Sequence, residues 1–276
     1  MKRLLQILGT LILFVVVYLA SSLTVGAVVG SFDAPSTDMR FMVINLAVVV
    51  MVFVLLTVVE RLLWSRREGV MIALRGFDPV AVLWGVIFLV SVYVVTSPLE
   101  SLLAADNRVF PDGGRTLILA VGIAPMFEEL IFRGRLVSML RHFASPSLAV
   151  VLSALLFAVA HGSLIVAVDA FIAGIILGYF YYLKGSIITP IILHICNNAI
   201  AYAMMQLSYH DKSIQELIVG SENYFVIYAV ALVVVVVGFG HLVRTMRRVD
   251  RRSHQPEVNL EEEEQPSELV DDEEME

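Results

Sequence analysis

The 276-residue sequence predicts an all-α, polytopic membrane protein with about eight transmembrane helices and a four-helix core. Its mean hydropathy is +0.83 and 58% of its residues are hydrophobic, whereas a soluble domain is about half apolar. These residues form long blocks, each near the roughly 20 residues that a helix needs to cross the hydrocarbon core. The blocks do not alternate polar and apolar residues, which excludes a closed membrane barrel.

The predicted spans follow from the positions of these blocks and of their boundary residues. The first block exceeds the apolar region of a cleavable signal peptide, so we expect it to be retained as a span. Asp78 and Pro79 can cap and open the third helix, and Ser145 and Pro146 can do the same for the fifth. The spans are residues 4–30, 41–59, 80–97, 116–132, 146–161, 165–183, 186–206 and 224–243.

The distribution of basic residues predicts the orientation of these spans. With eight spans and both termini in the cytoplasm, fifteen of the 19 Lys and Arg residues fall in cytoplasmic segments and four fall outside. An odd number of spans would scramble this bias, which inserted helices normally show. The short loops fit a prokaryotic plasma membrane. We therefore expect a multi-pass protein of the plasma membrane with both termini in the cytoplasm.

Four regions are expected along the chain. Residues 1–115 hold three transmembrane helices, 116–206 the four-helix core, 207–252 the last helix and a basic juxtamembrane segment, and 253–276 an acidic tail. The net charge of −7 comes from the C-terminal end, because the chain from position 244 onward holds five Arg and twelve Asp or Glu. Like charges in blocks predict a disordered, solvated tail. No nucleic-acid partner is expected, and nothing in the sequence indicates an oligomeric state.

Polar side chains inside the predicted membrane helices are concentrated in the fourth to seventh spans. A charged side chain at the centre of a membrane helix costs roughly 2.5–3.5 kcal/mol on insertion scales. Such groups therefore face the bundle interior or a water-filled cavity, and they mark candidate functional sites. They are Glu128, Glu129, Arg133, His161, Asp169, His194, Asn197 and Asn198.

Helical spacing indicates which of these side chains share a face. His194 and Asn198 are four residues apart and lie one turn from each other. Glu129 and Arg133 have the same spacing, in the order that favours an ion pair, whereas Glu128 is rotated by about 100° from Glu129. We therefore expect Arg133 to be the structural partner of Glu129, and Glu128 to be free for chemistry.

The depth of the side chains in the membrane is the second geometric test. Glu128 and His194 each lie roughly 10–12 Å from the cytoplasmic ends of their helices at 1.5 Å per residue. Phe157 places an aromatic ring beside His161, but a straight fifth helix would carry His161 roughly 22 Å down. Either that helix begins later than expected, or it is tilted across a conical cavity.

Three motifs lie in order on these four helices: Glu128-Glu129-x-x-Phe132-Arg133, then Phe157-x-x-x-His161, then His194-x-x-x-Asn198. They resemble the signature motifs of the CPBP intramembrane protease family, which includes the CAAX prenyl endopeptidases of the Rce1 type and bacterial Abi proteins. The resemblance covers residues 116–206, and no motif position departs from the pattern. It implies an intramembrane endopeptidase for a membrane-associated protein or peptide, in CAAX-type processing or in bacterial peptide maturation and immunity.

The resemblance also implies a role for each motif residue. Glu128 would activate a water, with His161 assisting, to attack a peptide carbonyl, and His194 and Asn198 would stabilise the oxyanion. Glu129 and Arg133 would shape the site. A carboxylate base and preorganised donors suit this chemistry. The HExxH and GxSxG motifs of zinc and serine peptidases, and the GxGD motif of aspartyl intramembrane proteases, are missing.

Metal dependence is left open by the motifs. Glu128, His161 and His194 form a candidate Glu/His/His set with an open fourth position, as catalytic zinc sites have. Members of the family have been called metalloproteases, while the glutamate-and-water mechanism needs no ion. No two of these residues share one helix, so spacing does not decide. We expect no tightly bound ion, and a divalent metal such as zinc is the alternative.

Structural interpretations and two other functions use the same residues. The carboxylates and Arg133 can form a packing ion pair, and membrane His and Asn side chains often hydrogen-bond between helices. Gly174 and Gly178 predict a close helix contact, and Asp169 is expected at the mouth of the cavity rather than in catalysis. Asn197 and Cys196 are expected to pack on other faces. An ion-coupled transporter or a catalytically silent membrane scaffold are the alternatives to the endopeptidase.

Overall fold

The structure is a computed structural model that describes residues 1–31, 37–63, 77–102, 118–161, 164–208 and 223–254. Every element of this part of the chain is helical, which confirms the predicted all-α polytopic class. Among the described residues, five helices are long and apolar enough to cross a membrane: α1 (Lys2–Gly30), α2 (Thr37–Leu63), α3 (Pro79–Leu102), α8 (Leu164–Lys184) and α11 (Tyr224–His254). Two shorter apolar helices are α7 (Pro146–Ala160) and α9 (Ile188–Ser208).

The fourth predicted span is a helix with two wide turns. It runs through η2 (Ile118–Ile123), α5 (Ala124–Glu129), η3 (Leu130–Leu136) and α6 (Val137–Arg141), and both η2 and η3 are π-helical. Pro125 lies in the first turn of α5 and has no N–H to donate to the preceding turn, which favours a change of register there. In η3 the N–H of Val137 donates to the carbonyl of Phe132, five residues back. The helix thus continues to Arg141, beyond the predicted end at Phe132.

The predicted caps of the third and fifth helices are confirmed. The Asp78 carboxylate accepts the N–H groups of Val80 and Ala81 at 2.9 and 3.2 Å, and Pro79 opens α3. Lys184, at the end of α8, donates to the same carboxylate at 2.6 Å. The Ser145 hydroxyl accepts the N–H of Leu148 at the start of α7. These bonds satisfy donors that a helix start otherwise leaves unpaired.

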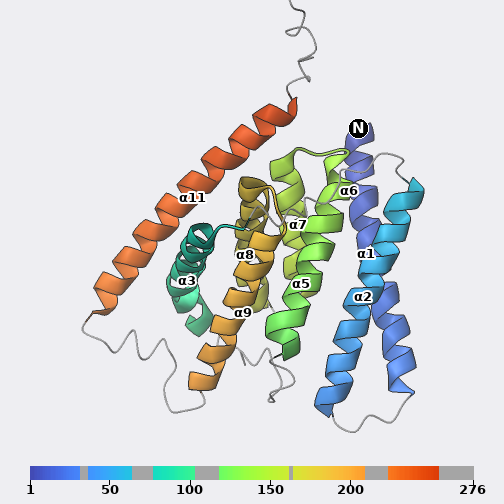
Figure 1. The fold of residues 1–276 in the computed structure, drawn as a ribbon, viewed down its shortest axis with the longest axis horizontal. Helices are drawn as coiled ribbons and strands as arrows, with labels where there is room; N and C mark the ends of the chain where they lie inside the picture. The colour runs from blue at the N-terminus through green and yellow to red at the C-terminus, as the bar shows by residue number, and fades with distance from the viewer. Residues whose placement is uncertain (32–36, 64–76, 103–117, 162–163, 209–222, 255–276) are drawn as a thin grey trace, which may run out of the picture.

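The helices form one bundle with the interrupted helix near its middle (Figure 1). α1 packs against α2 on one side, and α11 slants across the other side against α3. The beginning of α1 and the end of α11 lie at the same end of the bundle as α6 (Figure 1). One apolar core joins α1, α2, η3, α6 and α7, and a second joins α3, α8, α9 and α11. Large apolar side chains on the outside, including Val226 and Leu23, suit a lipid environment.

The closest helix contact is that of α7 with α8, as the two glycines predicted. A Cβ atom at Gly174 would lie 2.9 Å from the Cβ and 3.1 Å from the Cα of Ala154. A Cβ atom at Gly178 would lie 2.5 Å from a methyl of Val150. Small residues let the two backbones approach, which is the main source of attraction between helices in lipid.

One charged residue lies deeper than the predicted boundaries allowed. Glu60 was expected just outside the second span, but α2 continues to Leu63 and Glu60 is only 1% exposed. At the other end of the chain, α11 includes Ser253 and His254, which were expected in the acidic tail. The rest of that tail, residues 255–276, lies outside the described residues.

Candidate active site

The centre of the candidate site is a buried carboxylate, Glu129, at the end of α5. Its Oε1 accepts a hydrogen bond from Nη1 of Arg133 at 2.7 Å, and Nδ1 of His194 lies 2.9 Å from the same oxygen. Glu129 is 0% and Arg133 is 1% exposed. The predicted pair between Glu129 and Arg133 is therefore present, and Glu129 has a second partner that spacing did not indicate.

Arg133 joins three helices through one guanidinium group. In addition to Glu129, it donates from Nη2 to the carbonyl of Gly174 in α8 at 2.9 Å. Its guanidinium carbon lies 5.0 Å from the centre of the Phe157 ring in α7, within the range of a cation–π contact. A charged side chain is tolerated inside a membrane protein when it is paired and hydrogen-bonded, and these three contacts stabilise the charge of Arg133.

The bond to Glu129 fixes the orientation of the His194 ring. An ionised carboxylate only accepts hydrogen bonds, so Nδ1 of His194 carries a hydrogen and donates to Glu129. The other ring nitrogen, Nε2, faces the second carboxylate: it lies 3.7 Å from Oε2 of Glu128. This distance is too long for a hydrogen bond, but both groups can contact one small molecule between them. The Glu128 side chain is 24% exposed, unlike Glu129.

His161 lies near the same region, where its ring contacts that of Phe157. It follows the last residue of α7, and Nδ1 lies 2.8 Å from the carbonyl of Phe157. Because a carbonyl only accepts, Nδ1 is the donor, which leaves Nε2 as the acceptor of the neutral ring. The Phe157 ring centre lies 4.6 Å from that of His161 and 5.6 Å from that of His194. The predicted contact between Phe157 and His161 is confirmed, and both imidazoles contact the same phenyl ring.

Asn198 anchors the far side of the site. Its amide donates to the carbonyl of Ala120 in η2 at 2.9 Å, so α9 is held against the interrupted helix one turn beyond His194. The amide group has two N–H donors, and this bond uses one of them. The Asn197 amide lies 3.5 Å from the Asn198 oxygen, a long contact.

The wide turns of the interrupted helix flank the two carboxylates. Glu128 and Glu129 end α5 directly before η3. The Ser153 hydroxyl of α7 donates to the carbonyl of Phe132 at 3.0 Å and thereby binds a carbonyl within the wide turn. Such turns are frequent at functional sites because they alter the direction of side chains within one helix.

The candidate metal ligands do not form a three-residue cluster in the described part of the chain. No group of three His, Cys, Asp or Glu side chains there is close enough to hold an ion. Glu128 and His194 approach each other, but the described contacts include no ion pair or hydrogen bond between Glu128 and His161. The arrangement of these three side chains therefore does not fit a preformed Glu/His/His site.

A second buried polar cluster, not predicted from the sequence, lies around Glu60. Glu60 of α2 accepts hydrogen bonds from Arg135 at 2.9 Å and from the Ser138 hydroxyl at 2.8 Å. The Arg135 guanidinium also lies 5.3 Å from the centre of the Phe53 ring. Arg135 was counted as a loop charge, because the helix was expected to end before it. This cluster fixes η3 and α6 to α2, and η3 directly follows the two carboxylates of the site.

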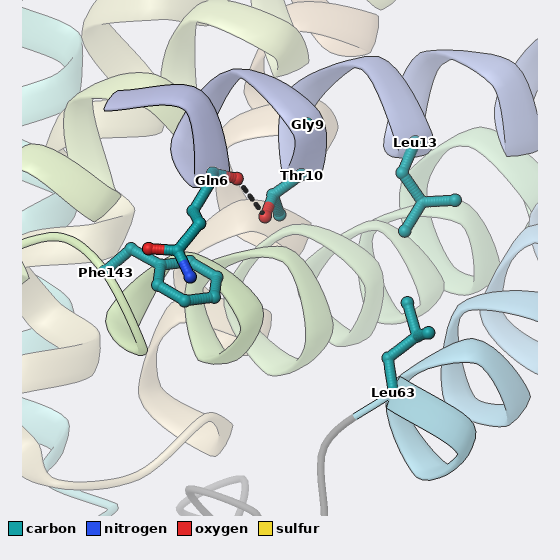
Figure 2. Close-up of a pocket in the computed structure, with 6 residues that line it drawn as sticks. All are labelled: Gln6, Gly9, Thr10, Leu13, Leu63 and Phe143. Carbon is teal, nitrogen blue, oxygen red and sulfur yellow. Dashed lines mark hydrogen bonds between the residues drawn. The ribbon is translucent and has the colours of Figure 1, made fainter. Parts of the chain in front are cut away.

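One further sequence expectation concerns Asp169. Asp169 accepts a hydrogen bond from Thr96 of α3 at 3.2 Å, so it connects α8 with α3. A shallow cavity of about 200 Å³ lies between α1, the end of α2 and the end of α6, where Gln6, Thr10, Leu63 and Phe143 line it (Figure 2). None of the predicted site residues lines this cavity, and the polar network therefore defines the candidate site.

Comparison with known families agrees with this geometry. The family model described as Type II CAAX prenyl endopeptidase Rce1-like matches residues 115–200. The matched segment contains all three motifs, which confirms the resemblance predicted from them, and it supports an intramembrane CAAX-type endopeptidase in general. Helices α1, α2, α3 and α11 lie outside it. A search of curated proteins and a search of solved structures found no match.

Proposed function

We propose that this chain is an intramembrane endopeptidase of the CAAX type that hydrolyses a peptide bond with a water activated by Glu128. The proposal starts from the Rce1-like match of residues 115–200. One observation of the structure carries it further: Oε2 of Glu128 lies 3.7 Å from Nε2 of His194, and Glu128 is the accessible member of the carboxylate pair. A water or a peptide carbonyl can contact both groups there.

The two carboxylates have different tasks in this proposal. Glu129 is buried between Arg133 and His194, so it holds the imidazole in place. Glu128 has no hydrogen-bonded partner among the described residues and can take a proton from water. The water oxygen then forms a bond to the carbonyl carbon of the substrate, and the carbonyl oxygen becomes an oxyanion.

Donors for the oxyanion come from α9. The second N–H of the Asn198 amide is one, and Nε2–H of His194 is the other when this ring is an imidazolium. The tetrahedral intermediate breaks its C–N bond, and the departing amine receives a proton from the Glu128 carboxyl. His161, with Nε2 as the acceptor, assists proton transfer at the edge of the site.

The substrate in this proposal is a membrane-associated protein or peptide. The site lies on helices that are buried in a membrane bundle, so the scissile bond has to be brought there by a lipid-anchored or membrane-embedded chain. CAAX-type processing and bacterial peptide maturation both supply such substrates. The proposed setting is the plasma membrane with both termini in the cytoplasm.

The test is peptide cleavage by the purified full-length protein in liposomes. Membrane peptides from cells that express the wild type are compared with those from cells that express Glu128→Gln, and a peptide that differs is synthesised as the substrate. We expect kcat to fall by about 10² or more in Glu128→Gln and in His194→Ala, because each removes a group that acts in the transition state.

Two controls separate loss of chemistry from loss of fold. Cys196→Ser alters a neighbouring position of α9 that the proposal does not use, and it should retain activity. Thermal unfolding should show that Glu128→Gln is as stable as the wild type. Cleavage at the wild-type rate by both site variants would refute the proposal. Full complementation by Glu128→Gln in cells would indicate a scaffold instead, and ion flux lost in this variant would indicate a transporter.

A further inference from the structure

The C-terminal end of α11 carries a row of arginines on one face. Arg244, Arg247, Arg248, Arg251 and Arg252, here called the arginine row, recur with the spacing of a single helix side. All five are exposed, and none forms a hydrogen bond or ion pair with another described residue. The positive-inside rule accounts for basic residues at this end of a span, but it does not place them on one face.

The opposite face of the same segment is fixed to the bundle. Leu242 and Met246 are buried in the apolar core of α3, α8 and α9. Asp250 accepts the N–H of Ser147 at the start of α7 at 2.9 Å. These contacts prevent rotation of the helix about its axis, so the arginine row has a set direction away from the bundle.

The direction of the arginine row is that of the lipid-facing side of α11. Val230, Val233 and Val237 are 58%, 62% and 57% exposed. At 100° per residue these valines lie in line with Arg244 and Arg251. The rise from Val237 to Arg244 is about 10 Å, which is enough to pass from acyl chains into the headgroup layer. α11 slants across the bundle, and its C-terminal end extends past the other helices (Figure 1).

We propose that the arginine row binds the phosphate groups of anionic phospholipids in the leaflet beside the C-terminal end of α11. One guanidinium group can donate two parallel hydrogen bonds to two oxygens of a phosphate. A membrane with anionic lipids attracts clusters of basic residues. The acidic residues 255–276 also have the charge to occupy the row. The alignment with the valines favours lipid, because the face that contacts acyl chains continues into the row without a break.

The experiment measures the thermal unfolding midpoint of the full-length protein in uncharged detergent. Phosphatidylglycerol or phosphatidylcholine is added at low and at high salt. We compare the wild type with the triple variant Arg244→Gln, Arg248→Gln and Arg251→Gln. The charge-matched control is Lys2→Gln, Arg3→Gln and Arg61→Gln, which alters three exposed basic residues elsewhere.

The expected result is a larger rise of the midpoint with phosphatidylglycerol than with phosphatidylcholine, which high salt weakens. The triple variant should lose most of this excess and the control variant should keep it. Equal loss in both variants would show general charge attraction and overturn the proposal. The proposal would also be overturned if the wild type shows no larger rise with phosphatidylglycerol but a variant that lacks residues 255–276 does. The tail would then occupy the row.

A separate observation places a residue of α1 at the candidate site. Phe14 is buried, and its ring centre lies 5.3 Å from that of Phe132, the aromatic residue of the first motif. Tyr18, one turn further along α1, stacks on Phe14 with ring centres 6.5 Å apart. Glu128 is one turn before Phe132 in a helix that runs opposite to α1 in the bundle (Figure 1).

This register brings Tyr18 opposite Glu128. Phe14 contacts Phe132, and the two helices run in opposite directions. The residue one turn after Phe14 on α1, Tyr18, therefore lies at the level of the residue one turn before Phe132, Glu128 of α5. Tyr18 is half-buried at this position. The tyrosine lies on a helix outside the segment that matches the family.

We infer that Tyr18 is a positioning residue for Glu128: its hydroxyl donates to the water that the carboxylate holds. This inference rests on the proposed function. Removing a donor that orients the base lowers the rate of the chemical step and leaves substrate binding nearly unchanged.

The test compares Tyr18→Phe with Tyr224→Phe, a tyrosine of α11 far from the site. On the peptide substrate described above, Tyr18→Phe should lower kcat by about tenfold with KM within about twofold, and Tyr224→Phe should alter neither. A loss of thermal stability in Tyr18→Phe with unchanged kcat would refute the inference. Wild-type kcat in Tyr18→Phe, with loss of activity in Glu128→Gln, would refute it and leave the proposed function intact.

Discussion

Replacing Arg133 with methionine should destabilise the bundle by about 3–5 kcal/mol, the usual effect of removing one partner of a buried ion pair. The size follows from three losses. The Glu129 carboxylate keeps only His194, the Gly174 carbonyl loses its donor, and the Phe157 ring loses its cation. Because Glu129 is 0% exposed, water cannot replace the missing donor.

A double-mutant cycle measures how much of this effect belongs to the pair. Unfolding free energies are determined in mixed micelles by titration with a denaturing detergent for Arg133→Met, Glu129→Gln and the double variant. The double variant should be less destabilised than the sum of the single variants by roughly 1–3 kcal/mol, because it leaves no unpaired charge. The exposed Arg61→Met is the control, with an expected change within about 0.5 kcal/mol.

Two outcomes would contradict this account of Arg133. A loss below about 1 kcal/mol in Arg133→Met would show that the pair is not needed for the bundle. Strict additivity of the two single variants would show that Arg133 and Glu129 act independently, although their atoms lie 2.7 Å apart.

Three further predictions concern the packing of α8 and its ends. Gly174→Ala should destabilise the protein by about 1–3 kcal/mol because the new methyl would lie 2.9 Å from a side chain of α7. Gly26→Ala is the control and should be neutral or stabilising, because Gly26 has open space around it. Unfolding titrations that rank the two variants equally would refute this. Tyr179→Phe should cost about 1 kcal/mol by removing the 2.7 Å bond to the histidine of α11, whereas Tyr228→Phe loses only a 3.5 Å contact and should change the midpoint little. The lysine at the end of α8 and the backbone N–H groups of α3 hold the pKa of Asp78 below its usual range, so its contribution to stability is present above about pH 4 and is lost as the pH falls through the lowered value. The difference in midpoint between the wild type and Asp78→Asn should therefore shrink from pH 6 towards pH 3, and a constant difference would contradict it.

Hydropathy and helical spacing were sufficient for most of the fold and for one ion pair of the candidate site. The order of the helices follows from apolar blocks, and the pair of Glu129 with Arg133 follows from a spacing of four residues within one helix. The caps at Asp78 and Ser145 were readable because a short polar side chain before a proline has one common role.

Contacts between helices could not be predicted in the same way. Spacing shows which side chains share a face, but it does not show which helix that face meets. Glu60 bonds to Arg135, 75 positions away, and His194 bonds to Glu129 rather than only approaching Glu128. For His161, α7 begins at Pro146 as expected, so a later start of this helix does not account for its depth, and its ring contacts Phe157.

The wide turn after Glu129 directs side chains of one helix towards two different neighbouring helices. Glu128 and Arg135 are seven positions apart, so a regular α-helix would aim them to nearly the same side. A turn that takes one residue more shifts everything downstream by roughly 100°. Glu128 accordingly meets the imidazole of α9, while Arg135 meets the carboxylate of α2. The proposed catalytic base and the anchoring arginine thereby lie on different sides of a single helix.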